Sequence, residues 1–234
     1  MGYRDQFGTD TYVHVCNRGA KKLPIYREEG DLWRLLANFF YLNHQESMPE
    51  NWIRKLKQSG LWTPGVYSWP KEWEPRAPLV AILAFCIMHN HLHLVLKEKV
   101  EKGIPKFMHR MSMSYSKFIN EKYKETGSLF QGAYRSRVVT DDAYLRHLAI
   151  YVQVKNPFEL NPKGLRYAIE NFDTSFEEAK TYPFTSVHAY ATGEDNPILD
   201  KDIYGEMFAQ PETFMQLARD TMLYKLEALD VCTL

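Results

Sequence analysis

The spacing of hydrophobic residues changes along the chain between that of strands and that of helices. Residues 11–16 are rich in β-branched and aromatic side chains and end at a turn-forming Asn-Arg-Gly sequence, which predicts a first strand. Apolar side chains then recur at intervals of three and four over residues 28–43 and again over residues 104–123. Because this spacing gathers them on one side of a helix, we expect two amphipathic helices here.

Three further segments have the character of strands. Residues 79–88 are almost all apolar, which favours a central strand, and residues 91–97 predict the next strand. His89 and Asn90 would form the tight connection between the two. Residues 133–139 alternate in polarity, so that Arg135 and Arg137 would share one face of a strand.

A further helix should follow, because the hydroxyl of Thr140 can cap it and the two acidic residues after it oppose the helix dipole. We expect this helix to reach about Lys155 and to stop at Asn156 and Pro157. The resulting order β-α-β-β-α-β-α predicts an α+β fold of the ferredoxin-like or RRM-like kind, an antiparallel sheet with helices on one face. We assign residues 1–157 to this domain and residues 158–234 to an acidic, mainly helical C-terminal extension.

One segment of the predicted domain, residues 48–78, has no clear periodicity. It contains five prolines and four of the five tryptophans, Trp52, Trp62, Trp69 and Trp73. A loop of this length in a compact domain is usually functional or packs on itself. The tryptophans could stack on unpaired bases, or the segment could fold over the sheet as a small core of its own, which we favour.

Composition and charge narrow the class of protein. A hydrophobic content of 45% indicates a globular chain, and three scattered cysteines form neither a disulfide framework nor a metal-binding pair. With no signal peptide and no long apolar run, we expect a soluble, intracellular protein. The net charge is zero, but residues 97–138 hold ten basic residues against four acidic ones, whereas acidic residues predominate after residue 158. This distribution fits a central region that meets phosphates, or an ordinary solvated helix face.

His91 and His93 are the first candidates for chemistry. In a strand, side chains two residues apart point to the same face, with their Cα atoms about 7 Å apart, so the two imidazoles could bind one metal ion. A pair of histidines on a strand is also common as hydrogen-bonded surface or core. The spacing by itself leaves both interpretations open.

Several motifs, taken together, resemble those of a known family. They are Asn17-Arg18-Gly19, the run from Met88 to His93, the run from Gly127 to Arg137, the helix from Ala143 through Tyr151 to Pro157, and Tyr182 to Ser186. In this order they resemble the IS200-like, single-tyrosine HUH transposases, most closely the branch associated with REP palindromes. The resemblance runs from about residue 11 to residue 190. It implies cutting and rejoining of single-stranded DNA at the foot of hairpins, in a cytoplasmic, nucleoid-associated protein.

The resemblance also implies roles for individual residues. His91 and His93 match the histidine pair that binds a divalent metal, Mg²⁺ or Mn²⁺, and Tyr151 matches the nucleophile that forms a 5′-phosphotyrosine. Family members usually place a third ligand, asparagine or glutamine, four residues after the tyrosine, where this chain has Lys155. Asn156 could serve if a π-bulge brought it round, and Gln153 is the other candidate.

A set of polar and basic residues are candidates for holding DNA. Asn17 and Arg18 would help to read bases, and the others would contact the DNA backbone: Lys106, Arg110, Lys117, Arg135 and Arg137. Ordinary surface charge is the alternative for the basic residues.

Two other functions remain open at this stage. The first is a domesticated protein that binds hairpin DNA without cutting it, suggested by the displaced asparagine. The second is a nucleotide hydrolase of the histidine-triad type, since His89, His91 and His93 also fit its HxHxH pattern. Simple IS200-type enzymes pair two chains, whereas the REP-associated branch can act alone. The C-terminal extension makes us favour a monomer, with a homodimer as the alternative.

Overall fold

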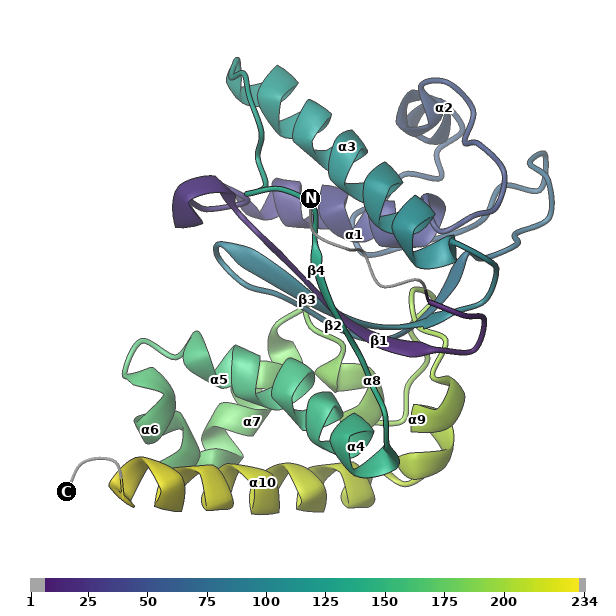
Figure 1. Cartoon of the computed structure of the whole chain (residues 1–234). Helices are drawn as coiled ribbons and strands as arrows, with labels where there is room; N and C mark the ends of the chain where they lie inside the picture. The colour runs from purple at the N-terminus through teal and green to yellow at the C-terminus, as the bar shows by residue number, and fades with distance from the viewer. Residues whose placement is uncertain (1–6, 232–234) are drawn as a thin grey trace. The chain divides into compact units, whose positions relative to one another are not determined.

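The protein is an α+β structure built around one four-stranded sheet (Figure 1). The computed structural model describes residues 7–231, and side chains as far as residue 226. The strands are β1 (Tyr12–Arg18), β2 (Val80–Ile87), β3 (His91–Glu98) and β4 (Arg135–Val138). They lie in the order β2-β3-β1-β4, which is the order of a split βαβ sheet. The predicted α+β fold class and the order β-α-β-β-α-β-α are both confirmed.

The helices include those predicted at residues 28–43 and 104–123 and after residue 140. They are η1 (Ala20–Lys22), α1 (Glu29–Tyr41), α2 (Trp52–Gln58), α3 (Gly103–Tyr123), α4 (Asp142–Ile150), η2 (Tyr151–Lys155), α5 (Asn156–Glu159), α6 (Gly164–Glu170), α7 (Phe172–Thr181), α8 (Val187–Ala191), α9 (Asp202–Met207) and α10 (Pro211–Val231). Among the described residues we find no helix with the length and apolar character of a membrane span.

The chain divides into two compact units. The first comprises Met1–Ala81, His89–His91 and Leu96–Val138, and the second comprises Ile82–Met88, Leu92–Val95 and Val139–Leu234. The predicted division into a domain of residues 1–157 and an extension of residues 158–234 stays a prediction.

In the first unit, α1 packs along α3 (Figure 1). The rings of Phe39 and Phe107 meet edge to face with their centroids 6.4 Å apart. β1 is antiparallel to β4, with His14 opposite Arg137 and Cys16 opposite Arg135. The side chains of β1 alternate between buried and half-buried, as the period of a strand requires.

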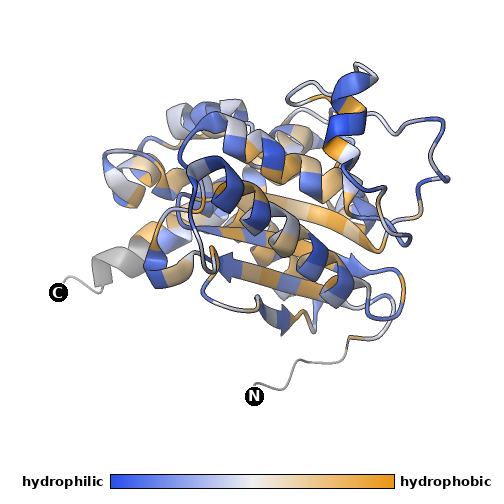
Figure 2. Ribbon diagram, turned by 90° about the horizontal axis from the view of Figure 1, so that it is seen from above, coloured by the Kyte–Doolittle hydropathy of each residue, from blue (hydrophilic) through white to orange (hydrophobic). Residues whose placement is uncertain are grey.

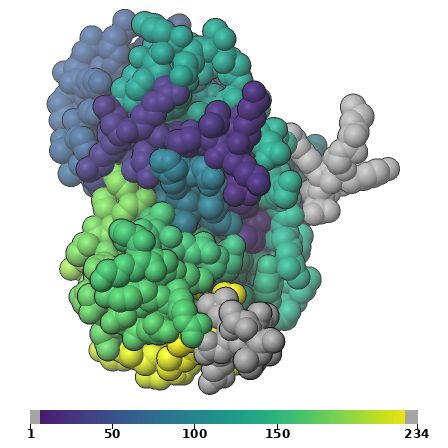
Figure 3. Space-filling view, turned by 90° about the vertical axis from the view of Figure 1, so that its left-hand side faces the viewer, coloured from purple at the N-terminus to yellow at the C-terminus, as the bar shows by residue number. Residues whose placement is uncertain are grey.

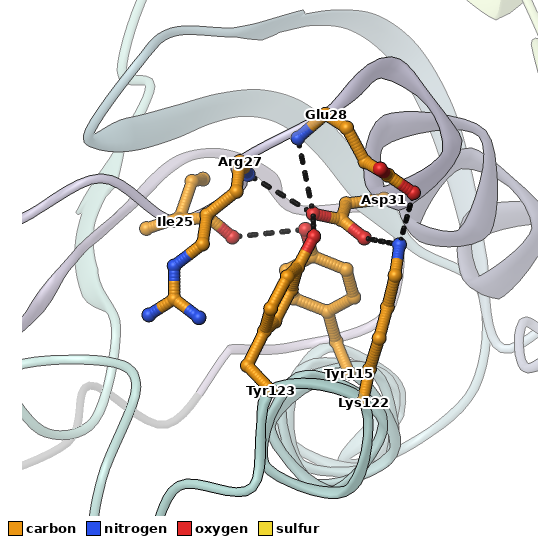
Figure 4. Close-up of polar contacts among 7 residues, drawn as sticks. All are labelled: Ile25, Arg27, Glu28, Asp31, Tyr115, Lys122 and Tyr123. Atoms are coloured by element: carbon orange, nitrogen blue, oxygen red, sulfur yellow. Dashed lines mark hydrogen bonds and ion pairs between the residues drawn. The ribbon is translucent and has the colours of Figure 1, made fainter.

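A buried carboxylate joins the start of α1 to the end of α3 (Figure 4). Asp31 accepts hydrogen bonds from Lys122 Nζ at 2.6 Å, from the Tyr123 hydroxyl at 2.7 Å and from the backbone N–H of Arg27 at 2.9 Å. Burial alone raises the pKa of Asp31, but these donors outweigh it, and the pKa lies below its usual value. The charged form of Asp31 is therefore part of the native packing.

The tryptophan-rich segment folds as a small aromatic core at the end of α1. Trp69 lies 5.3 Å from Trp73 and 6.2 Å from Tyr41, measured between ring centroids, and Trp52 is buried. This agrees with the small core that we favoured. The expectation of a wholly irregular segment was wrong at Trp52–Gln58, which forms α2, because one buried face at Trp52 and Leu56 suffices for two turns of helix.

In the second unit, α10 contacts α4, α6 and α8 (Figure 1). Figure 3 shows its yellow atoms against the green atoms of the preceding helices. Two buried tyrosines connect its parts: the Tyr190 hydroxyl donates to Leu83 O at 2.6 Å, and the Tyr204 hydroxyl donates to Leu145 O at 2.8 Å. Every residue of β2 is buried, in keeping with the apolar strands seen in Figure 2. The helices after residue 158 therefore share their core with α4 and β2.

Candidate functional site

Strand β3 carries the two candidate histidines. Since they are two residues apart, His91 and His93 point to the same side of the strand. His91 is half-buried and His93 is 5% exposed. The apolar residue between them, Leu92, is fully buried on the other side. The strand thus places the two imidazoles beside each other on one face.

Within the second unit, His93 lies against Tyr151. The imidazole and phenol rings meet edge to face at 90°, with centroids 5.5 Å apart. Tyr151 is half-buried and is not enclosed among hydrocarbon side chains, because it also lines a cavity described below. The residue expected to act as nucleophile is therefore next to one of the residues expected to bind metal.

The backbone after Tyr151 departs from the α-helix. Residues Tyr151–Lys155 form a π-helical turn, and the N–H of Asn156 donates to Tyr151 O, five residues earlier. A π turn accommodates one residue more than an α turn. Asn156 therefore follows Tyr151 by one turn, as a residue four positions later would in an α-helix. The expected helix distortion is confirmed.

Both ends of this helix differ from the sequence prediction. The cap is Asp141, whose side chain accepts from the N–H of Tyr144 at 2.7 Å, and not Thr140. A carboxylate placed three residues before that N–H is the better acceptor, because it also opposes the helix dipole. The helix also does not stop at Asn156 and Pro157. It continues through α5 to Glu159, since Pro157 occupies the first turn of α5, where proline is tolerated.

The two candidates for a third metal ligand differ in their partners. Asn156 is fully buried, and neither its Oδ1 nor its Nδ2 has a hydrogen-bond partner among the described residues. Gln153 is also fully buried, but its Oε1 accepts from Ser186 Oγ at 2.9 Å. Gln153 Nε2 is also unpaired, but a cation binds oxygen, and of the two amide oxygens only Asn156 Oδ1 has no partner among the described residues. An unpaired buried polar group costs about 1–3 kcal/mol, which a bound cation would offset at Asn156.

The donor set fits a divalent cation. Two imidazoles and one amide oxygen suit Mn²⁺ or Mg²⁺ with further positions left for water or phosphate oxygens. In the part of the chain that the structure describes, no group of three His, Cys, Asp or Glu side chains could hold a metal.

Next to Tyr151 the second unit contains a cavity of about 300 Å³. Its lining comes from α4, the π turn and α10: His147, Tyr151, Lys155, Thr221, Met222, Tyr224 and Lys225. Lys155 Nζ lies 4.9 Å from the centre of the Tyr151 ring and 2.6 Å from Glu159 Oε1. His147 was not among the residues predicted from the sequence, although its position four residues before Tyr151 places it on the same helix face. No local pattern indicated the residues from α10.

A second cavity, of about 310 Å³, lies in the first unit, and its lining is Cys16, Asn17, Arg18, Gln131, Gly132, Ala133 and Arg135. Arg18 and Arg135 are exposed there. Asn17 is buried, and its Nδ2 donates to Ser112 Oγ at 3.2 Å. The structure thus presents the two arginines to solvent and turns the Asn17 amide toward α3.

The remaining basic candidates have different surroundings. Lys106 Nζ donates to Gln45 O at 2.6 Å, and Arg110 donates to Glu46 O at 2.9 Å, so both hold the segment after α1. Lys117 is exposed and lies 3.7 Å from Glu121. Arg137 is exposed on β4 opposite His14. Of these four residues, Arg110 is half-buried, and Lys106, Lys117 and Arg137 are exposed.

Comparison with known proteins gives one family match. Residues 76–155 match the family described as "Transposase IS200 like". This segment includes β2, β3, α3, β4, α4 and the π turn. The solved structure of a REP-associated tyrosine transposase bound to a REP hairpin is similar, with a TM-score of 0.44 and 11% identity over 86% of this chain and 90% of that chain. No curated protein matches the sequence.

Proposed function

We propose that the protein cleaves and rejoins single-stranded DNA at hairpins, on the premise that residues 76–155, which match the family described as "Transposase IS200 like", act as a single-tyrosine transposase domain. The observation that carries the proposal is the edge-to-face contact of His93 with Tyr151, 5.5 Å between centroids. It unites two residue types that metal-assisted phosphoryl transfer to tyrosine requires, a metal ligand and a phenol.

In this proposal Tyr151 is the nucleophile. Its phenol oxygen bonds to the phosphorus of one phosphodiester as the bond from phosphorus to the 3′-oxygen breaks. The phenol gives up one proton and the departing 3′-oxygen takes one, so the products are a 5′-phosphotyrosine and a free 3′-hydroxyl. Because the new bond is still a phosphodiester, a 3′-hydroxyl of another strand can reverse the step and join new ends.

His91, His93 and Asn156 would hold the divalent metal, Mg²⁺ or Mn²⁺. The bound ion would neutralise charge on the scissile phosphate and on the departing oxygen. Support for Asn156 over Gln153 comes from the buried amide without a partner and from the π turn that returns it to the side of Tyr151. The Gln153 oxygen is already engaged by Ser186.

DNA would be held by exposed cationic groups. Arg18 and Arg135 line one cavity, and Lys225 lines the cavity at Tyr151. We propose that hairpin or single-stranded DNA is the partner, with Arg137 and Lys117 as further backbone contacts, and that a single chain suffices. Asn17, Lys106 and Arg110 already make hydrogen bonds within the protein. To bind DNA as proposed, they would need to make further contacts beside these.

A covalent-adduct experiment tests this proposal. The protein is incubated with Mn²⁺ and labelled single-stranded hairpins from its own genomic flanks, and the products are separated in SDS. We expect a labelled adduct from the wild type and from Tyr144→Phe, a half-buried tyrosine in α4 that serves as control. Tyr151→Phe should bind the hairpins and give no adduct.

Two outcomes would contradict the proposal. An adduct that persists in Tyr151→Phe would remove Tyr151 as the nucleophile. Tight hairpin binding by the wild type with no adduct on any flanking hairpin would instead indicate a protein that binds hairpins without cutting them.

A further inference from the structure

Asn90, in the turn between β2 and β3, makes two hydrogen bonds with its side chain. Its Nδ2 donates to Lys22 O at 3.0 Å, and its Oδ1 lies 2.7 Å from Nδ1 of His91. One amide thus connects the segment after β1 to the first histidine of the candidate metal pair. The proposed metal site does not include this residue.

The two contacts determine which nitrogen of His91 carries a proton. A backbone carbonyl only accepts, so the Asn90 amide must direct its NH₂ group toward Lys22. Its oxygen then faces His91, and because that oxygen also only accepts, Nδ1 of His91 must be the donor. In the neutral ring the lone pair is left on Nε2.

The segment that holds Asn90 is itself tightly constrained. The N–H of Gly19 donates to Asn90 O at 2.8 Å, and the N–H of Ile25 donates to His89 O at 3.0 Å. Lys21 and Lys22 adopt left-handed backbone angles, with φ of 54° and 64°. At Gly19 a Cβ atom would lie 2.2 Å from Leu23 O, so only glycine fits there. These contacts fix the carbonyl of Lys22 in place, and with it the amide of Asn90.

We propose that Asn90 is a positioning residue, which holds His91 as the Nδ1–H tautomer so that Nε2 is the metal-binding nitrogen. The inference rests on the proposed function only in assigning a metal to His91. The physical reason is general: a metal-binding imidazole is oriented by the partner of its other nitrogen, and loss of that partner typically lowers metal affinity about 10–100-fold.

The tautomer can be measured in the metal-free protein by long-range ¹H–¹⁵N NMR at alkaline pH, where the ring is neutral. The His91 signals are identified by their loss in His91→Gln. We expect the wild type to show Nδ1–H. Asn90→Leu should shift His91 toward Nε2–H and lower Mn²⁺ affinity about 10–100-fold by calorimetry. Asn90→Asp, which keeps an acceptor, should retain the tautomer and most of the affinity.

Asn120→Leu is the matched control. The Asn120 amide likewise donates to a backbone carbonyl, that of Gly127 at 2.9 Å, but it lies far from the histidines in the sequence. It should change neither the tautomer nor the affinity. An Nε2–H tautomer at His91 in the wild type would overturn the proposal, and so would unchanged Mn²⁺ affinity in Asn90→Leu. If the wild type binds Mn²⁺ but forms no adduct, the result would count against the proposed function and not against the role of Asn90.

Discussion

The backbone N–H of Asn156 donates its hydrogen bond to the carbonyl oxygen of Tyr151, so five residues close this turn of helix. An α turn would have been closed by Lys155, whose cationic side chain cannot bind a metal ion. The π turn lets the chain carry one additional residue and still return an amide to the side of the tyrosine.

Deletion of Lys155 should therefore be tolerated. The shortened chain can form an ordinary α turn, and the asparagine then follows Tyr151 by four residues. The partly exposed Lys155–Glu159 ion pair is lost with the lysine and contributes about 1 kcal/mol, so we expect a melting temperature within a few degrees of the wild type. Circular dichroism and the adduct assay measure both properties.

Insertion of one alanine after Lys155 is the control for this deletion. It moves the asparagine about 100° further round the helix, and we expect adduct formation to be lost. If the deletion variant folds but forms no adduct, the position of the asparagine one turn after Tyr151 is not what activity requires.

Asn156→Leu should make the metal-free protein more stable and less able to bind metal. The fully buried amide has no partner among the described residues, and its replacement by an apolar side chain removes a cost of about 1–3 kcal/mol. Urea unfolding in EDTA should show this gain, and calorimetry with Mn²⁺ should show weaker binding. Gln153→Leu, which breaks the bond to Ser186, should leave Mn²⁺ affinity unchanged. Equal Mn²⁺ affinity in Asn156→Leu and wild type would exclude Asn156 as a ligand.

His14 should make stability fall between about pH 6.5 and pH 4. Burial, and secondarily the charge of Arg137, lower the pKa of His14 to about 4. Above pH 6.5 the ring is neutral in both the folded and unfolded states. Below that pH the unfolded chain binds a proton that the folded protein does not, so the free energy of unfolding decreases as the pH falls toward 4.

The test compares urea unfolding of wild type and His14→Gln from pH 7 to pH 4. The variant should lose less stability over this interval, and Arg137→Gln should lie between the two, because it removes only the smaller cause of the shift. Parallel curves for wild type and His14→Gln would contradict this prediction.

Asp31→Asn should destabilise the packing of α1 on α3. The carboxylate accepts from Lys122, Tyr123 and the backbone, and its loss leaves the Lys122 ammonium beside a neutral amide (Figure 4). The Lys122 side chain is 29% exposed and keeps Glu28 as a partner, so the cost is that of weakening charge-assisted hydrogen bonds, about 1.5–3 kcal/mol, which chemical denaturation can measure. Glu125→Gln, in the exposed pair with Arg27, is the control and should change stability much less than Asp31→Asn.

The carboxylate of Asp31 should also make the free energy of unfolding depend on pH in the acidic range. Because the folded-state pKa of Asp31 lies below its usual value, its contribution is complete above the unfolded pKa of about 4 and is lost as the pH falls below that value. The difference in stability between wild type and Asp31→Asn should narrow over this acidic range. A constant difference down to pH 2 would show that the charge of Asp31 is not the cause.

Most elements of the fold could be predicted from the sequence because their signals are local. The periodicity of residues 104–123 and the apolar run of residues 79–88 each depend on neighbouring side chains only, and both became the expected helix and strand. The distortion after Tyr151 has no such local signal. It was suggested by the resemblance to the IS200-like family, in which the third ligand usually follows the tyrosine by four residues, whereas Asn156 follows Tyr151 by five.

The amino-acid sequence determined the order of strands and helices and the spacing of His91 and His93, since both follow from repeats of two and of about 3.6 residues. Only the tertiary structure decided which side chains make hydrogen bonds within the protein and which line a cavity. Asn17 and Arg110 turn inward to bond α3 and the segment after α1, whereas α10 brings Lys225 to the cavity at Tyr151. The physical reason is that hydrogen bonds and cavities join residues dozens of positions apart, and their partners are chosen by packing and not by local periodicity.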